Sequence, residues 1–133
     1  MAARSKARKR ALDLLFASEL RGESPVVALD RAIAEGEGPT NDYTVTLVRG
    51  VAGEREEIDR LIASSAQGWS LERMPAVDRN VLRLGVYELL HVDDVPDAVA
   101  VTEAMNLVRD LSTDDSPSFV NGVLGAVLKA RKA

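Results

Sequence analysis

The stretch AVDRNVLRLGVYELLH, residues 76–91, decides the fold class. Its hydrophobic side chains recur at helical spacing and cover nearly the whole circumference of the predicted helix: Val77, Val81, Leu82, Leu84, Val86, Tyr87, Leu89 and Leu90. A helix that is hydrophobic on most sides must be surrounded by other elements. We therefore expect residues 76–91 to form the central helix of a helical bundle.

Further helices are expected on both sides of this central one. Hydrophobic residues at the same spacing predict them over residues 3–21, 24–35, 41–66, 102–111 and from 116 onward. Serine followed by proline, at Ser24 and again at Ser116, is typical of a helix start, where serine caps the helix and proline fits its first turn. No stretch reads convincingly as a strand, so the chain is predicted to be all-α.

Small and polar residues mark the connections. We expect Gly22 to end the first helix, Thr40 to cap the third, and residues 69–75 to form a turn or a single helical turn. Gly50 and Gly53 each cost about 1 kcal/mol relative to alanine inside a helix, which indicates either a close helix crossing or a bend. Arg55 falls within the hydrophobic arc of the same segment, and we interpret it as an ion-paired or snorkelling side chain.

Length and composition limit the class of protein. A chain of 133 residues fits one domain, and 46% hydrophobic with 29% charged residues is ordinary for a globular protein. Cysteine is absent, which excludes disulfides, thiolate metal ligands and a cysteine nucleophile. No hydrophobic run approaches the roughly 20 residues that span a bilayer, and acidic residues interrupt any secretory signal. We expect a cytoplasmic protein without a membrane partner.

Positive charge is concentrated at the two ends of the chain. The first ten residues contain Arg4, Lys6, Arg8, Lys9 and Arg10 and no acid, although the net charge of the chain is −4. These charges share no single side of a helix, so we expect residues 1–10 to form a solvated basic arm that projects from the core. If all five neutralised phosphates of a single RNA strand, log K would fall with log salt at a slope of about −3.5. A basic tail that only adds solubility is the alternative.

The residues that enzymes need are missing or isolated. His91 is the only histidine and stands at an expected helix end, where its interaction with the helix dipole is the simpler interpretation. Asp93–Asp94 and Asp114–Asp115 are adjacent pairs in loops, as solvated turn residues are. No glycine-rich phosphate loop and no metal-binding spacing is present. We therefore predict no catalytic residue, no metal site, no cofactor and no enzymatic activity.

Phe119 is the aromatic residue for which a functional role is weighed. It follows Ser116 and Pro117 at the start of the last expected helix, at the margin of the hydrophobic arc. Pattern alone favours a core aromatic that closes the bundle. The alternative is a platform on which an RNA base stacks, worth about 1–3 kcal/mol per base.

Three segments together resemble the NusB transcription antitermination family. ARKRAL (7–12), followed by Leu15 and Phe16, is similar to the arginine-rich first helix of that family. VLRLGVYEL (81–89), DVP (94–96) and VAV (99–101) resemble its central signature, and DDS (114–116) with FVNGVL (119–124) resembles its last helix. The ordered combination is specific, whereas residues 22–70 match mainly in helical pattern.

This resemblance implies a compact fold of about seven helices in two subdomains, with residues 1–133 as a single RNA-binding domain. It implies that the chain pairs with the ribosomal protein NusE and binds boxA-type single-stranded RNA of ribosomal RNA leader transcripts. Such a complex helps RNA polymerase to resist termination. Some relatives self-associate, and the sequence leaves a homodimer open.

The resemblance also assigns residues. It implies RNA contact by Arg4, Lys6 and Arg8, to which the basic arm adds Lys9 and Arg10, and by Asp115 and Phe119. It implies contact with the protein partner by Phe16, Asp78 and Arg79. The chain departs from the family at Pro117 and Ser118, where an aromatic or basic residue is frequent, and at Phe16, where tyrosine is common.

Two other function classes stay open at this point. A protein-interaction bundle with a basic tail would show no preference between RNA sequences. An RNA-binding part of an enzyme is the other, because similar helical domains occur fused to RNA methyltransferases. That hypothesis needs a catalytic domain that this sequence does not contain.

Overall fold

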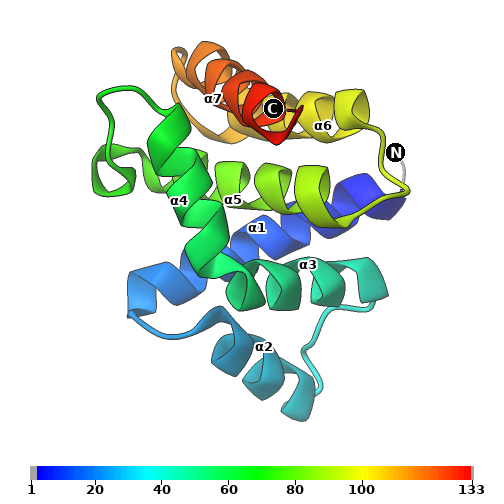
Figure 1. Cartoon of the computed structure of the whole chain (residues 1–133). Helices are drawn as coiled ribbons and strands as arrows, with labels where there is room; N and C mark the ends of the chain where they lie inside the picture. Colours follow the sequence, from blue (N-terminus) through cyan, green and yellow to red (C-terminus); the bar gives the residue numbers. More distant parts are fainter. Residues whose placement is uncertain (1–2, 133) are drawn as a thin grey trace. The chain divides into compact units, whose positions relative to one another are not determined.

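The computed structural model describes residues 3–132, with Lys132 described by its backbone alone. Within this range it contains seven α-helices, one short 3-10 helix and no strand (Figure 1). None of the described helices is long and apolar enough to cross a membrane. The chain divides into two compact units, residues 1–54 and 55–133. The prediction of an all-α fold of about seven helices in two subdomains is confirmed.

Three helices build the first unit: α1 (Ala3–Arg21), α2 (Pro25–Ala34) and α3 (Asp42–Gly53). α1 packs against both α2 and α3. The hydrophobic stripes that predicted these helices supply fully or almost fully buried side chains, among them Leu12, Leu15, Leu29, Leu47, Val48 and Val51. Gly22 ends α1 as predicted, with a φ of 68° that favours glycine.

Polar caps fix the starts of α2 and α3. The hydroxyl of Ser24 accepts a hydrogen bond from the Val26 N–H at 3.3 Å, as the serine–proline pattern predicted. At α3 the cap is Asn41, whose side chain accepts a hydrogen bond from the Tyr43 N–H at 2.8 Å. The prediction of Thr40 as the cap is therefore wrong by one residue. Both are residue types that cap helices, so the sequence could not decide between them.

The segment predicted as one helix over residues 41–66 is two helices in the structure. α3 ends at Gly53, and α4 (Arg55–Ser65) begins after one intervening residue. A Cβ at Gly53 would meet nothing within 4 Å, so this glycine marks the bend and not a close crossing. The low helix propensity of glycine and the acidic Glu56 and Glu57, which favour a helix start, account for the break.

The second unit holds α4, the 3-10 helix η1 (Leu71–Arg73), α5 (Ala76–His91), α6 (Asp97–Leu111) and α7 (Ser116–Lys132). α5 packs against α4, α6 and α7, and Figure 1 shows α6 and α7 together on one side of it. Val81, Leu82 and Val86 of α5 are fully buried, which confirms its central place. Packing is close at Gly85, where a Cβ would lie 3.3 Å from Leu124 Cδ2.

α6 starts earlier than predicted, at Asp97 and not near Thr102. The β-branched Val99 and Val101 lower local helix propensity and obscured the start in the sequence. Tertiary packing overrides that preference. Ala100, Ala104 and Val108 follow one another at four-residue spacing and are buried on one face of α6.

A network of ion pairs lies within the second unit. The Asp59 carboxylate accepts hydrogen bonds from Arg55 Nε at 2.9 Å and from Arg83 Nε at 2.8 Å. The interpretation of Arg55 as an ion-paired side chain is confirmed. Arg83 is only 4% exposed, so the pair with Asp59 also satisfies a buried charge. His91 ends α5 as expected, and its Nε2 lies 3.1 Å from the Glu57 carboxylate.

Candidate nucleic-acid interface

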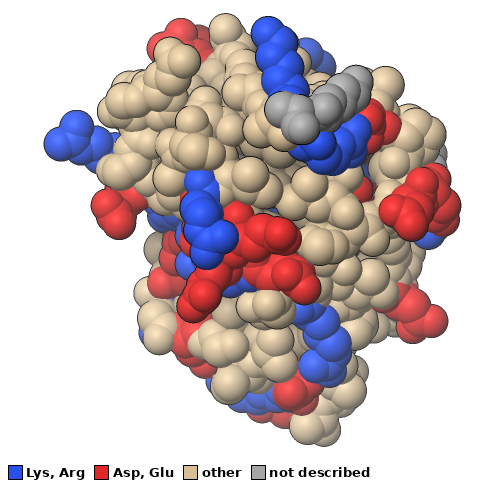
Figure 2. Space-filling view, in the orientation of Figure 1, with Lys and Arg blue, Asp and Glu red and all other residues tan. Residues whose placement is uncertain are grey.

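Charged side chains of both signs are interspersed over the face shown in Figure 2. A large surface of one sign would attract a polyanion at long range, and this face does not carry one. On this face, binding of RNA would therefore depend on local groups. The predicted groups lie at the start of α1 in the first unit and around the start of α7 in the second.

The basic residues at the start of α1 belong to a packed helix. The Arg4 guanidinium lies 4.2 Å from the centroid of the Tyr43 ring and that of Arg8 lies 5.6 Å from it, and Arg8 is only 3% exposed. The Thr44 hydroxyl donates a hydrogen bond to the Ala7 carbonyl at 3.0 Å, which ties α1 to α3. The prediction of a projecting arm over residues 1–10 is therefore wrong for residues 3–10, because the Tyr43 ring attracts both guanidinium groups. Met1 and Ala2 lie outside the described residues.

The remaining three cations of this segment differ in their partners. Lys9 Nζ forms an exposed ion pair with Asp13 at 2.9 Å. Lys6 and Arg10 are exposed, and within residues 3–132 their side chains form no ion pair or hydrogen bond. The five charges that the sequence treated alike are thus unequally available to a phosphate.

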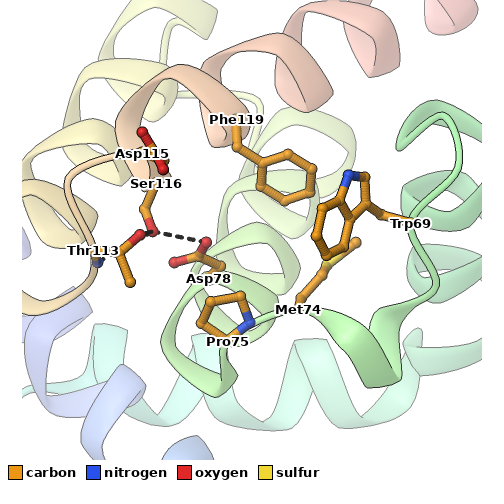
Figure 3. A pocket seen from close by; sticks show the side chains of 8 residues that line it. All are labelled: Trp69, Met74, Pro75, Asp78, Thr113, Asp115, Ser116 and Phe119. Carbon is orange, nitrogen blue, oxygen red and sulfur yellow. Dashed lines mark hydrogen bonds between the residues drawn. The ribbon is translucent and has the colours of Figure 1, made fainter.

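A cavity of about 230 Å³ opens beside the start of α7 (Figure 3). Its lining comes from the η1 region, α5, the α6–α7 turn and the start of α7: Trp69, Met74, Pro75, Asp78, Thr113, Asp115, Ser116 and Phe119. The rings of Trp69 and Phe119 meet edge to face, with centroids 6.1 Å apart and 64° between their planes. Phe119 is half-buried and lines this open cavity, so it does not close the core as pattern alone favoured. Asp115 is exposed at the same cavity.

The buried side chain of Asp78 joins α5 to the turn that leads into α7. Its carboxylate accepts hydrogen bonds from the Ser116 hydroxyl at 2.8 Å and from the Ser112 hydroxyl. Ser116 is the first residue of α7 and directs its hydroxyl at Asp78, so the prediction that it caps this helix is wrong. Asp78 is 2% exposed. Its carboxylate is therefore not available for the contact with a protein partner that the sequence predicted. The Asp78 carboxylate can be buried because two serine hydroxyls donate hydrogen bonds to it.

The next residue, Arg79, holds the opposite wall of the cavity. Its Nη1 donates hydrogen bonds to the carbonyl of Leu71 at 2.7 Å and to that of Met74 at 3.0 Å. Consecutive residues of α5 thus anchor η1 and the α6–α7 turn. Arg79 and Phe16 are both partly exposed, and their contact with a protein partner stays a prediction.

Trp69 lines the cavity, although its sequence pattern placed it only in a connecting turn. It is the only tryptophan of the chain, and it is 52% exposed. A large aromatic side chain that stands in a polar turn, outside every hydrophobic stripe, is the signal that could have revealed it. Its contact with Phe119, fifty positions later, could not be read from the sequence.

The sequence model of the NusB family matches residues 5–129. The chain belongs to the NusB family. The matched region includes Lys6 and Arg10 as well as the whole aromatic cavity, so both candidate regions lie within the NusB domain. The resemblance predicted from the three sequence segments is confirmed.

A curated NusB relative shows how similar the sequences are. The transcription antitermination protein NusB of Nocardioides sp. is 73% identical over 129 residues, which cover 97% of this chain and 96% of the relative. As a NusB antitermination factor, the chain is not an enzyme, as predicted.

Solved NusB structures share the fold. T. maritima NusB has a TM-score of 0.85 and 34% sequence identity, and the match covers 96% of this chain and 92% of that one. A NusB chain solved in a complex of the antitermination factors NusB and NusE with double-stranded RNA has a TM-score of 0.81 and 33% identity, covering 96% of each chain. The neighbouring fold is therefore one found in complex with both an RNA and a protein.

Proposed function

We propose that this NusB chain binds boxA-type single-stranded RNA of ribosomal RNA leader transcripts together with the ribosomal protein NusE. The complex would act on RNA polymerase in the cytoplasm, with no cofactor. The observation that carries the proposal is the open cavity between Trp69 and Phe119. An aromatic cavity of this kind fits an unstacked base, and unstacked bases are what single-stranded RNA offers.

The two units contribute different contacts within one RNA-binding domain. In the second unit, Phe119 and Trp69 provide ring surfaces for a base, and the exposed Asp115 carboxylate can accept a hydrogen bond from a base amino group. In the first unit, the cations of α1 provide charge for phosphates. Arg4 and Arg8 contribute mainly by holding α1 in place, because their guanidinium groups already lie against the Tyr43 ring.

Partner binding is assigned to Phe16 on α1 and to the exposed part of Arg79 on α5. The support is the sequence resemblance and the solved complex of a related NusB with NusE. Self-association is the competing use of these surfaces. Sedimentation of the chain with and without NusE separates the two, because a homodimer that covers the partner surface would dissociate as NusE binds.

The first test is fluorescence anisotropy of a labelled boxA-type RNA strand, with a scrambled strand and a boxA duplex of equal length as controls. The expected result is preferential binding of the single boxA strand, strengthened by NusE. The duplex arm matters because the related complex contains double-stranded RNA. Equal binding to boxA and scrambled strands would reject sequence recognition. No binding in any arm would favour a protein-interaction bundle.

The variants Phe119→Leu and Trp69→Leu test the cavity. Leucine keeps hydrophobic volume and removes the ring, so each variant should lose about 1–3 kcal/mol of RNA binding free energy while remaining folded. Leu111→Ala is the matched control, because Leu111 is an exposed hydrophobic residue of the same unit that does not line the cavity. Wild-type affinity in both ring variants would remove the cavity from the proposed interface.

A further inference from the structure

A groove of about 340 Å³ lies in the first unit between α1 and α2. Its lining comes from the second half of α1, from α2 and from the residues that follow α2. None of the residues that the proposed function assigns to RNA or to NusE lines this α1–α2 groove. The groove is therefore a separate surface of the first unit.

The helix α2 exposes more hydrophobic surface than its packing explains. Seven of its ten residues are hydrophobic, and only two of the seven, Ala28 and Leu29, are buried. The other five are Val26, Val27, Ala32, Ile33 and Ala34. Val27 is 54% exposed and Ile33 46%, on a helix that lies at the edge of the first unit (Figure 1). A helix of this composition usually buries a hydrophobic stripe, so α2 has surface left for another element.

The floor of the groove is hydrophobic and shallow. Four side chains form it: Leu14, Ala17, Ala28 and Ala32. Alanine side chains end at Cβ, so a third helix could approach the axes of α1 and α2 closely. The Ser18 hydroxyl, which also lines the groove, donates a hydrogen bond to the Leu15 carbonyl at 3.0 Å. The floor therefore suits hydrophobic side chains of a ligand.

The two ends of the groove carry opposite charge. Glu23 precedes α2, and both Arg31, at 2.6 Å, and Arg21, at 3.8 Å, pair with its carboxylate. Two positive charges meet one negative charge there, so this end stays positive. Glu35 and Glu37 follow α2 and line the other end. Both are exposed, and neither carboxylate forms an ion pair or hydrogen bond with residues 3–132, so that end is negative.

These charges select the class of ligand. A nucleic acid strand fits poorly, because its phosphates would meet the carboxylates of Glu35 and Glu37. A small polar ligand would find no free donor on the floor, where the Ser18 hydroxyl is already used. An amphipathic helix fits all three features, because it offers a hydrophobic stripe between ends of different charge.

We propose that the α1–α2 groove docks an amphipathic helix of a further protein partner. Its hydrophobic stripe lies on the alanine floor, its acidic first turn meets Arg21 and Arg31, and its basic last turn meets Glu35 and Glu37. Acids in the first turn and bases in the last turn are also the order that the helix dipole favours, so a stable helix fits in one direction. The groove residues of α1 span about 10 Å, which two to three helical turns cover.

The test uses two labelled helical peptides of about 16 residues, each with leucines at helical spacing. The first has glutamates in its first turn and lysines in its last turn, and the second has these charges exchanged. The variant Arg21→Glu/Glu37→Arg exchanges the charges of the groove without changing the net charge. The wild type should bind the first peptide roughly threefold to tenfold more tightly than the second, and the variant should reverse this preference. The reversal is decisive, because it does not depend on which peptide is the better helix.

Filling the groove locates the bound peptide. Ala32→Phe places a ring on the floor and should abolish binding of both peptides, while unfolding, boxA affinity and NusE affinity stay as in the wild type. Ala34→Phe is the matched control, because Ala34 is exposed on the same helix and does not line the groove. In amide NMR spectra, the first peptide should shift residues of α1 and α2.

The outcomes separate this proposal from the proposed function, which needs neither peptide. If the wild type and the exchanged variant prefer the same peptide, or if Ala32→Phe binds like Ala34→Phe, the helix site is wrong and RNA binding is unaffected. If neither peptide binds and Ala32→Phe dissociates a dimer seen by sedimentation, the groove belongs to a second copy of the chain. Loss of boxA binding in the folded Ala32→Phe variant, with no binding of either peptide to the wild type, would assign it to RNA.

Discussion

At the scale of single residues, Asp78 shows how one buried carboxylate organises the wall of the ring cavity. Both of its oxygens accept hydrogen bonds, from the Ser112 and Ser116 hydroxyls, and the turn that they fix carries Asp115 and leads to Phe119. A buried carboxylate is stable only when such donors meet it. Under the proposed function, Asp78 would act on RNA through the turn that it positions.

Asp78→Asn should destabilise the second unit and weaken RNA binding together. The amide keeps the shape but replaces one acceptor by a donor, and breaking buried hydrogen bonds of this kind costs about 1–3 kcal/mol of unfolding free energy. Urea unfolding and anisotropy measure the two effects. Asp97→Asn is the control, since Asp97 is more exposed and pairs with Arg131 at the surface. Unchanged stability with lost NusE affinity would return Asp78 to the partner surface.

Whether a residue role predicted from the sequence was right depended on contacts with residues far away in the sequence. The basic character of residues 4–10 could be read directly, but Arg8 is buried because Tyr43 packs over it, and nothing local indicates that. Trp69 was missed for the same reason, since its significance comes from Phe119. Phe119 was singled out by its place at the margin of a hydrophobic arc, where pattern alone favoured the core, and the family resemblance then implied the RNA contact.

At the scale of elements, an ion pair fastens the connection between α1 and α2. Arg31 on α2 donates two hydrogen bonds to the Glu23 carboxylate, at 2.6 and 3.0 Å. The hydrogen bond from Arg31 is the largest influence and holds the pKa of Glu23 below its usual range. Burial, the second largest, opposes it, and the charges of Arg31 and Arg21 lower the pKa further. The charged carboxylate is therefore favoured in the folded unit.

Glu23→Gln should remove a pH-dependent part of the stability of the first unit. A lowered carboxyl pKa stabilises the fold above the ordinary glutamate range, and this contribution is lost as the pH falls through the pKa of the folded state. Wild type and variant should therefore differ in urea unfolding near neutral pH and converge in acid. The double variant with Arg31→Gln provides the cycle that isolates the pair. A difference that stays constant down to acidic pH would contradict this account.

The elements themselves were largely predictable, and the exceptions have physical causes. α5 and the start of α2 follow from hydrophobic spacing and from Ser24 with Pro25, which act locally. The break at Gly53 was visible only as one of two alternatives, because a glycine permits both a bend and a close crossing. The start of α6 depended on the burial of Ala100, which local propensity does not report.

At the scale of the whole molecule, the predicted RNA-contacting cations and the ring cavity lie in different units. Lys6 and Arg10, the two of the five cations of residues 4–10 that have no partner among the described residues, are in the first unit, and the ring cavity is in the second, in a protein of net charge −4. The net charge repels nucleic acid in general, so affinity must come from these few contacts. Such a molecule should discriminate between RNAs better than a uniformly basic one.

The salt dependence of the wild type tests this division. If Lys6 and Arg10 are the cations that meet phosphates, the slope of log K against log salt for the chain alone is about −1.4, and not the −3.5 expected for five contacts. Anisotropy over a series of sodium chloride concentrations measures it. A slope near −3.5 would mean that Arg4, Arg8 and Lys9 leave their present partners when RNA binds.

The adjacency of Asp78 and Arg79 has a kinetic consequence. Because these two neighbours hold the α6–α7 turn and η1, the width of the ring cavity is set when the protein folds. A base that enters finds no loop to order, and little conformational entropy is lost on association. Substitutions of Asp78 or Arg79 should therefore change chiefly the residence time of a bound RNA.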